Sequence, residues 1–320
     1  MFQLAQDRSQ MGTELRAVVV SALQDLMKEN DRVVALEADL GGASGFTKIQ
    51  ASNPDRFVQC GIAEADMMGI AAGMSSEGFI PFTHTFGPFA TRRCFDQVFL
   101  SGAYAGNTIN IYGSDPGFAV ATNGGTHTTY EDMGLMRTIP GAVVCDAADA
   151  IQMEWIIRAF ANLGAGVHYV RGNRKAVREV YAPGSTFEMG KGNVLRSGSD
   201  VLIIAAGQLV SDALDAAETL EAQGISCEVI DMFCVKPLDV DLVVSETAGK
   251  KCVVTFENHG VIGGLGSAVA EVLAEKNLGV PLVRHGVVER FGQVGPASFL
   301  QKEYHLTADD LVNTVTEALA

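Results

Sequence analysis

Two kinds of segment alternate along the whole chain. Short runs rich in valine, isoleucine and other apolar residues are separated by longer stretches in which apolar residues recur every three or four positions. The short runs are typical of strands buried in a parallel sheet, and the longer stretches are typical of helices with one apolar face. This alternation predicts an α/β protein in which mostly parallel sheets are flanked by helices on both faces.

The first half of the chain carries several of the strand-like runs. They cover residues 33–37, 79–83, 108–112, 142–145 and 167–170. Helices are predicted over 13–28 and 147–162, and Asp146 is the expected N-cap of the second one.

The periodicity fades between residues 172 and 199 into Gly, Pro, Arg and Lys. Such a composition favours a linker between domains. We therefore place a boundary near residue 190, with a first domain over 1–190 and a second over 191–320, each built on its own mostly parallel sheet.

The strand and helix pattern resumes after the boundary. Strands are predicted over 201–205, 225–230, 252–256 and 281–285, and helices over 208–223, 240–247 and 265–276. Thr307 and Asp310 have the spacing of a capping box, which predicts a last helix that runs to Ala320.

The composition narrows the classes of function. With 320 residues, 48% of them hydrophobic and 19% charged, the chain is long enough for two domains and too apolar for long disordered tails. Its formal net charge of -15 repels phosphodiester backbones, so we expect no nucleic-acid partner. No run approaches the ~20 apolar residues of a membrane span, so we expect no association with a membrane. The six cysteines form no Cys-x-x-Cys pair, which favours buried thiols in the cytoplasm over a zinc site or a disulfide framework.

Glu64 is the first candidate for chemistry. It follows Gly61-Ile62-Ala63, where a strand-like run over 56–60 gives way to an apolar helix over 67–74. A carboxylate at the open end of a parallel strand, flanked by apolar residues, could be desolvated and used in catalysis. A glutamate that only complements the helix dipole is the alternative, and the residue on its own favours that simpler explanation.

Aromatic residues and one histidine are further candidates. Phe82, Phe86 and Phe89 lie in a loop-like stretch rich in turn residues, where clustered rings could stack on a planar heterocycle, although ordinary core aromatics give the same pattern. His127 ends the glycine turn Asn123-Gly-Gly-Thr-His127 and is a candidate acid, base or hydrogen-bond donor. A loop histidine without a function is the alternative.

A second glycine-rich turn follows the predicted strand over 252–256. Its sequence Gly264-x-Gly266-x-x-Val269 lacks the third glycine of a dinucleotide-binding fingerprint and lies far from the first strand of the chain. This context disfavours NAD binding.

Taken together, these segments resemble the transketolase family in order and spacing, from about Gly12 to the C-terminus. The segments that carry the resemblance are 37–40, 57–64, 85–97, 124–127 and 257–267. The resemblance implies the pyrimidine-binding and C-terminal domains of an enzyme that uses thiamine diphosphate to transfer a two-carbon ketol unit from a ketose donor to an aldose acceptor.

The resemblance also implies roles for individual residues. Glu64 matches the glutamate that hydrogen-bonds the aminopyrimidine ring of the cofactor, and His127 matches a histidine that contacts the donor near its reacting hydroxyl. The other residues implied at the cofactor are Asp39, Leu40, Ile62, Phe86, Phe89 and Arg93, and the two phenylalanines match rings that stack on or enclose the pyrimidine. Arg16 and Arg171 match positions that bind the phosphate of the substrate.

Two positions depart from the family pattern. Asn123 stands where an aspartate is common, and Asp115 stands where a histidine that faces the substrate phosphate is common. A carboxylate repels a phosphate. We therefore count Asp115 and Asn123 among the substrate-contacting residues and expect a donor or acceptor other than the standard phosphorylated sugars.

The metal-binding part of the family has no counterpart in this sequence. A complete enzyme of the family carries an N-terminal domain whose Gly-Asp-Gly motif and downstream Asn hold magnesium and the diphosphate, and no segment here matches it. We therefore expect that this chain provides no metal ligand and acts only with a thiamine-diphosphate-binding partner subunit, which holds most of the Mg²⁺ and the diphosphate. An α2β2 assembly with the site at the subunit interface follows from this arrangement.

Three other functions stay open at this point. The beta subunit of a 2-oxo acid dehydrogenase decarboxylase shares both domains and the split arrangement, although 61–64 and 85–97 fit transketolases better. An enzyme like deoxyxylulose phosphate synthase is the second alternative, although that enzyme is normally one chain. A non-catalytic assembly subunit is the third; Asp115 and Asn123 favour it, and the retained Glu64 opposes it.

Overall fold

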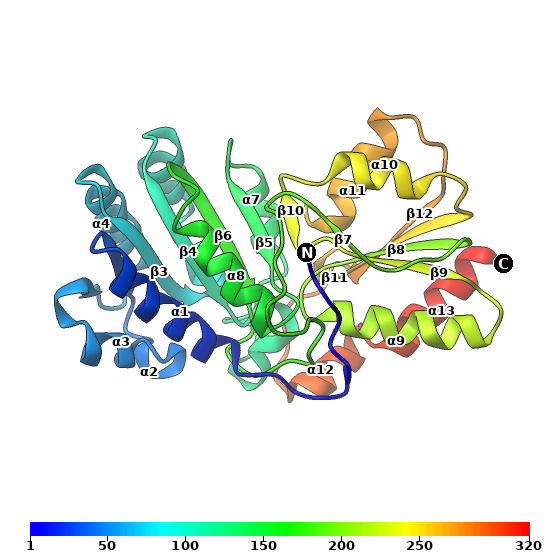
Figure 1. Cartoon of the computed structure of the whole chain (residues 1–320), viewed down its shortest axis with the longest axis horizontal. Helices are drawn as coiled ribbons and strands as arrows, with labels where there is room; N and C mark the ends of the chain where they lie inside the picture. The colour runs from blue at the N-terminus through cyan, green and yellow to red at the C-terminus, as the bar shows by residue number, and fades with distance from the viewer.

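The strand-like runs that are apolar at every position form the centres of two sheets. In the computed structural model, which describes residues 1–320, β1 (Val33–Glu37) and β8 (Val201–Ala205) are buried along their whole lengths. Strands that are covered on both faces need such continuous apolar runs. Each sheet forms the middle layer of one lobe of the molecule (Figure 1), and we call the two lobes the first and the second domain.

The first sheet has seven strands in the order β10-β5-β6-β4-β3-β1-β2. All neighbours are parallel except β10, which pairs antiparallel with β5. The strands are β1 (Val33–Glu37), β2 (Phe57–Gln59), β3 (Ile80–Phe86), β4 (Thr108–Ser114), β5 (Val143–Asp146), β6 (Gly166–Gly172) and β10 (Cys234–Lys236). The edge strand β10 therefore comes from the second half of the chain, whereas the other six strands lie between residues 33 and 172.

The second sheet has five strands in the order β12-β11-β8-β9-β7. They are β7 (Asn193–Arg196), β8 (Val201–Ala205), β9 (Cys227–Asp231), β11 (Cys252–Gly260) and β12 (Leu282–Val287), and only β7 runs antiparallel to its neighbour. Both sheets are thus mostly parallel and flanked by helices, which confirms the predicted two-domain α/β fold.

Helices cover both sheets. Those of the first domain are α1 (Leu15–Glu29), α2 (Gly41–Ser44), α3 (Thr47–Ser52), α4 (Glu64–Ser76), α5 (Gly87–Ala90), α6 (Phe95–Gln97), α7 (Asp132–Arg137) and α8 (Ala150–Phe160), with the short helical segments η1 (Pro54–Arg56), η2 (Val98–Tyr104) and η3 (Gly117–Asn123). Those of the second domain are α9 (Leu209–Ala222), α10 (Val240–Thr247), α11 (Leu265–Glu275), α12 (Ala297–Glu303) and α13 (Ala308–Leu319). No helix is both long enough and apolar enough to cross a bilayer.

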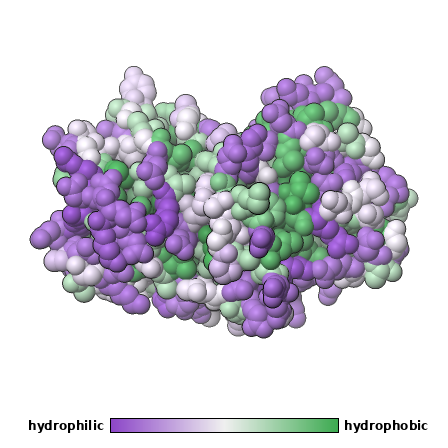
Figure 2. Space-filling view, in the orientation of Figure 1, coloured by the Kyte–Doolittle hydropathy of each residue, from purple (hydrophilic) through white to green (hydrophobic).

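The hydrophobic core is continuous between the domains. One cluster of buried residues joins Met133 and Met136 of α7 to Leu265 and Val269 of α11. A second cluster lies under α1 and α8 on the opposite face of the first sheet. Because apolar residues are buried across the junction, the two domains pack as one body. Figure 2 shows the surface of the molecule in the orientation of Figure 1. Hydrophilic residues cover much of the first domain on this surface, and a band of hydrophobic residues runs beside the junction between the domains.

Element ends differ from the prediction in informative ways. β3 continues to Phe86, so Phe82 is a buried strand residue in the core and not part of a loop. Helix α8 begins at Ala150, and its N-cap is Asp149, whose carboxylate accepts the Gln152 N–H at 2.9 Å; the expected cap Asp146 is the last residue of β5. The capping box of Thr307 and Asp310 is confirmed at the start of α13.

The expected linker is packed against the rest of the chain. Between residues 172 and 199 the chain forms β7, and it pairs with the N-terminal segment through bridges between Leu4 and Tyr181 and between Met11 and Arg178. Tyr181 has no exposed surface. The segment that the sequence predicts as a linker is thus held by contacts with the first residues of the chain.

Candidate active site

The ends of four neighbouring strands place the candidate residues along one edge of the first sheet. Glu37 at the end of β1 is level with Gln59 of β2 and with His84 of β3, and Phe86 of β3 is level with Ser114 of β4. The loops that follow these strands therefore meet at the carboxyl edge, which is where parallel α/β sheets form their sites.

Glu64 is the first residue of α4 and is almost completely buried. Its Oε1 accepts a hydrogen bond from Arg93 Nη1 at 2.8 Å and another from Thr85 Oγ1 at 3.3 Å. The Arg93 guanidinium in turn lies 3.6 Å from the centre of the Phe89 ring. A buried carboxylate is stable when it is paired and hydrogen-bonded, and these contacts fix Glu64 at the sheet edge.

Three rings form a cluster beside Glu64. The Phe86 and Phe89 ring centres are 6.1 Å apart, and the His127 ring lies 5.4 Å from Phe86 and 5.1 Å from Phe89, in edge-to-face arrangements. Phe86 ends β3, Phe89 lies in α5, and His127 comes from the loop between η3 and α7. The structure therefore brings together four of the candidate residues that the sequence separates by up to 63 positions, from Glu64 to His127.

The environment of His127 favours the neutral imidazole. Partial burial lowers the pKa of His127 below its usual value, and the nearby guanidinium groups of Arg93 and Arg174 lower it further. Its Nδ1 lies 2.9 Å from Thr126 Oγ1. A neutral imidazole held in this way has one ring nitrogen free to donate or accept a hydrogen bond at a ligand.

Arg174 is a site residue that the sequence analysis did not name. Its guanidinium lies 4.6 Å from the centre of the Phe86 ring, and its Nε and backbone N–H both donate to the carboxylate of Asp115. Burial raises the pKa of Asp115, and the charge and hydrogen bonds of Arg174 partly offset this effect. The expected contact between Asp115 and the substrate stays a prediction; in the structure the Asp115 side chain is buried and bound to Arg174.

Arg16 lies next to this pair. It belongs to the first turn of α1, and its backbone N–H donates to the Arg174 carbonyl at 3.3 Å. Its side chain is one-third exposed, with Nε bound to Glu14 and Nη1 bound to the Ala43 carbonyl. The backbones of Arg16 and Arg174 are therefore neighbours, and the Arg16 charge is paired with Glu14.

A buried polar network fixes the loops that carry Asp39, Leu40 and Ile62. Glu37 is fully buried, and its carboxylate accepts the Leu40 N–H at 2.6 Å and lies 3.2 Å from His84 Nδ1. Gln59 Oε1 accepts both the Asp39 N–H at 2.9 Å and the Gly61 N–H at 3.0 Å. Asp39 has a φ of 58°, which an L-residue adopts only when its surroundings hold it there. Ile62 follows Gly61 and is largely exposed.

Arg171, for which the sequence predicts contact with a substrate phosphate, lies inside the protein at the domain junction. Arg171 has no exposed surface, and its guanidinium lies 3.0 Å from the Asp132 carboxylate and 3.6 Å from that of Asp146. It also donates to the Asn258 carbonyl of the second domain at 2.9 Å. Arg171 therefore joins the two domains, and the cation of this segment that reaches the Phe86 ring is the partly exposed Arg174, three residues further on.

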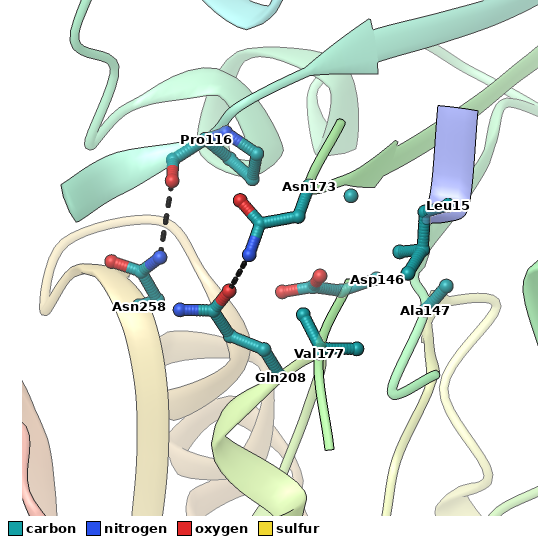
Figure 3. A pocket seen from close by; sticks show the side chains of 9 residues that line it. Leu15, Pro116, Asp146, Ala147, Asn173, Val177, Gln208 and Asn258 are labelled. Atoms are coloured by element: carbon teal, nitrogen blue, oxygen red, sulfur yellow. Dashed lines mark hydrogen bonds between the residues drawn. The ribbon is translucent and has the colours of Figure 1, made fainter. Parts of the chain in front are cut away.

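A small polar cavity lies beside Arg171 at the domain junction (Figure 3). Its volume of about 10 Å³ is enough for roughly one water molecule and far too small for a sugar. Asp146, Asn173, Gln208 and Asn258 are among the residues that line it, with Asn173 bonded to Gln208 and Asn258 bonded to the Pro116 carbonyl. This cavity belongs to the junction and not to the candidate active site.

The remaining candidates fall outside the ring cluster. Asn123 ends η3 and is exposed. The glycine turn after β11 is closed by Glu257, whose two carboxylate oxygens accept the N–H groups of Leu265 and Gly266 at 2.7 and 2.8 Å. A carboxylate of the chain itself thus occupies the position at the start of α11 where a phosphate would bind these two N–H groups.

Comparisons with known proteins agree with this architecture. The family model "Transketolase, pyrimidine binding domain" matches residues 12–180, and "Transketolase, C-terminal domain" matches residues 190–311. The chain is 44% identical to the 6-deoxy-6-sulfo-D-fructose transketolase subunit SqwH of Clostridium sp. (strain MSTE9), over 95% of this chain and 94% of the relative. It is 32% identical to an apulose-4-phosphate transketolase subunit of Phocaeicola vulgatus, over 94% of this chain and 96% of the relative.

Solved structures give the same result. A structure described as "Split gene transketolase, inactive beta4 tetramer" superposes with a TM-score of 0.86 at 41% identity and covers 96% of this chain and 98% of its own. The transketolase of Leishmania mexicana superposes with a TM-score of 0.82 at 21% identity, and this chain spans 48% of its length, which shows the shared fold. The chain therefore belongs to the transketolase family, as a subunit of the split type that carries the pyrimidine-binding and C-terminal domains.

Proposed function

We propose that the Glu64–Phe89–His127 edge of this chain is one half of a transketolase active site, and that a partner subunit completes it. The reaction moves a two-carbon ketol unit from a ketose donor to an aldose acceptor with thiamine diphosphate as cofactor. The observation that carries the proposal is the buried Glu64 carboxylate, which binds Arg93 at the carboxyl edge of a parallel sheet and is linked through it to the edge-to-face pair of Phe89 and Phe86.

The residues of this edge fit the pyrimidine end of the cofactor. Phe86 and Phe89 offer ring surface to a flat heterocycle, and Glu64 offers a carboxylate oxygen to a ring N–H. When bound, thiamine diphosphate supplies a nucleophilic carbon that takes up the ketol unit. Glu64 holds a proton at the pyrimidine, Arg93 keeps Glu64 in place, and Ile62 covers the ring from the adjacent turn.

The proposed roles of the other residues follow from their environment. His127, neutral near pH 7, donates or accepts a hydrogen bond at a hydroxyl of the donor. The network of Glu37 and Gln59 holds Asp39 and Leu40 near the cofactor. Glu64 and His127 are thus the residues proposed to handle protons, and the remainder bind or orient.

The substrate is proposed to be an anionic sugar. Arg174 has both Nη groups free of hydrogen-bond partners in the chain, since Asp115 binds only its Nε and backbone N–H. Arg16, one-third exposed and paired with Glu14, is proposed to contribute to the same anion site. Two Nη groups suit the oxygens of a phosphate or a sulfonate. The names of two relatives specify a sulfosugar and a sugar phosphate, which supports an anion without choosing between them.

The Asp115 carboxylate gives no reason to exclude a phosphate, because Arg174 neutralises it. Asn123 is exposed and stays a proposed donor contact. A substrate panel on the reconstituted enzyme should therefore rank sulfonated or phosphorylated ketoses well above their neutral counterparts in kcat/KM. An equal rate with a neutral ketose would contradict the anion site.

A partner subunit is proposed to hold the magnesium ion and the diphosphate. The structure brings together no group of three or more His, Cys, Asp or Glu side chains that could hold a metal ion. A related structure is described as an inactive β4 tetramer, which supports the proposal that such chains assemble but need another subunit for turnover. We propose an α2β2 assembly, a cytoplasmic location suited to the six free cysteines, and a domain boundary near residue 190.

Reconstitution tests the proposed function. The purified chain should show no ketol transfer with thiamine diphosphate and Mg²⁺, and addition of a subunit that carries the diphosphate-binding domain should create it. Decarboxylation of 2-oxo acids, measured in parallel, separates this function from that of a 2-oxo acid dehydrogenase. Ketol transfer by the chain alone would overturn the split arrangement, and a reconstituted complex that binds the cofactor without turnover would point to an assembly subunit.

A further inference from the structure

The loop that carries His127 is pressed against a loop of the second domain. A Cβ atom placed on Gly125 would lie 2.6 Å from the Gly292 carbonyl oxygen, and one placed on Gly124 would lie 2.6 Å from Val294 Cγ2. From the other side, a Cβ atom on Gly292 would overlap the side chain of Thr128. The two loops are thus in direct contact, and they are too close together for a side chain at Gly125 or Gly292.

Close approach is the reason for glycine at two of these positions. Gly125 and Gly292 lie outside the left-handed region, so an alanine could adopt their backbone angles, and only the missing space forbids it. Gly124 has a φ of 78° and needs glycine for both reasons. Gly125 and Gly292 therefore allow the same contact to be tested from each domain.

The second domain also holds the chain that follows His127. The Gly260 N–H donates to the Tyr130 carbonyl at 2.8 Å, and Arg137 Nη1 donates to the Gly263 carbonyl at 2.6 Å. These bonds fix the segment that leads into α7 and the last residue of that helix. The glycine contact is then the support that lies nearest to His127 itself.

A cavity adjoins this contact. It has a volume of about 600 Å³ and is lined on one side by Gly125, Thr128 and Tyr130 and on the other by Val261, Phe291 and Gly292. On its other side the His127 loop faces Phe86 and Phe89. Since an open cavity offers no packing atoms, the second-domain contacts that limit how far the loop stands from the ring cluster are those at Gly292 and Val294, and the Gly292 contact is the one made by backbone.

We propose that Gly292 is a positioning residue for the active site: its backbone, packed on Gly125 and Thr128, holds the His127 imidazole against Phe86 and Phe89. The second domain then contributes to substrate binding through a contact, although none of its side chains belongs to the ring cluster. The part that concerns substrate depends on the proposed function, whereas the position of His127 can be measured in the chain alone.

The first experiment follows the His127 imidazole by NMR in Gly292→Ala and Gly125→Ala variants of the whole chain. The chain has six histidines, and loss of one signal in His127→Asn assigns the resonance. We expect both variants to displace the His127 signal from its ring-shifted position and to raise its pKa toward that of an exposed histidine, with the other histidines unchanged. Gly73→Ala is the control, because Gly73 lies in α4 with open space around its added Cβ.

The outcome separates positioning from general damage. If the folded variants leave the chemical shift and the titration of His127 unchanged, the proposal is wrong. If neither variant folds, Val294→Ala, which removes an exposed partner of Gly124, takes their place, and the same two His127 measurements decide the outcome.

The second experiment measures kinetics in the reconstituted enzyme. Gly292→Ala should lower kcat/KM for the donor by about 10- to 100-fold, the cost of a small misplacement of a binding group, with the affinity for thiamine diphosphate within about twofold of the wild type. A displaced His127 signal with unchanged kinetics would remove the substrate role. A reconstituted enzyme without ketol transfer would count against the proposed function and leave the NMR result as it stands.

Discussion

Charged residues at the active-site edge occur as pairs in which a buried group holds a more exposed one. Asp115 is buried and binds Arg174, and the buried Glu64 binds the half-exposed Arg93. The sequence allowed Glu64 and His127 to be selected by residue type and by resemblance. It could not distinguish Arg171 from Arg174, because the two lie three residues apart and only the packing of the second domain decides which one is buried.

Replacement of Glu64 by glutamine should remove most of the turnover. The change keeps the size and the hydrogen bond to Thr85 but loses the charge, and loss of a positioned acid or base costs roughly two to four orders of magnitude in rate. Steady-state kinetics of the reconstituted enzyme measure this effect, and Glu77→Gln at the end of the same helix is the control. Activity near that of the control would show that Glu64 does not handle a proton.

Replacement of Arg174 by glutamine should weaken the binding of an anionic donor. A hydrogen bond to a charged group contributes about 1.5–3 kcal/mol, so KM should rise by roughly 10- to 150-fold, with kcat less affected. Arg174→Lys should recover part of the loss, because a lysine keeps the charge without the planar fork. Lys175→Gln, at the exposed neighbouring position, should leave KM unchanged; an equal rise in both variants would indicate only a general electrostatic effect.

The helices and strands show where periodicity is informative and where it is not. Segments with a clear apolar pattern were predicted with their ends correct or within a few residues; α10 at 240–247 and β8 at 201–205 are examples. β10 was missed because a strand of three residues is too short to show an alternation of apolar and polar positions. Its place in the first sheet also depends on β5, a partner far away in sequence. The start of α8 was misplaced because Asp146 and Asp149 have the same side chain, and only the fold decides which one caps the helix.

Helix α11 should depend on the carboxylate of Glu257. Glutamine at this position would turn an N–H₂ group toward one of the two backbone N–H donors, and a buried donor without an acceptor costs about 1–3 kcal/mol. Urea unfolding should show a loss of this size in Glu257→Gln and almost none in Glu275→Gln at the exposed end of the helix. Equal losses would exclude a specific capping role.

At the level of the whole molecule, the junction between the domains contains carboxyl groups that folding removes from water. Burial raises the pKa of Asp146 to about 7, partly countered by Arg171, and burial also raises the pKa of Asp231 to about 7. Unfolded aspartates titrate near pH 3.9. The folded chain therefore binds more protons between about pH 4 and pH 7, so the stability from these groups is greatest below pH 4 and is lost as the pH rises to about 7.

Asp231→Asn should remove part of this pH dependence. Asp231 accepts hydrogen bonds from Tyr181 and Gln152, and an asparagine oxygen can accept both. Relative to the wild type, the variant should gain on the order of 2 kcal/mol in free energy of unfolding between pH 5 and pH 8. Denaturant titrations at the two pH values measure the gain, with the exposed Asp241→Asn as control; a difference that is constant with pH would contradict the shifted titration.

The antiparallel strand β10 has a consequence for biosynthesis. During translation the ribosome releases residues 1–190 well before Cys234–Lys236, so until then the nascent first domain exposes the open edge of Val143–Asp146. An unpaired edge of apolar residues is a template for association with another chain. A gene fragment that stops at the end of the pyrimidine-binding domain would make this temporary state permanent, and the shortest fragment that completes the first sheet must include Lys236.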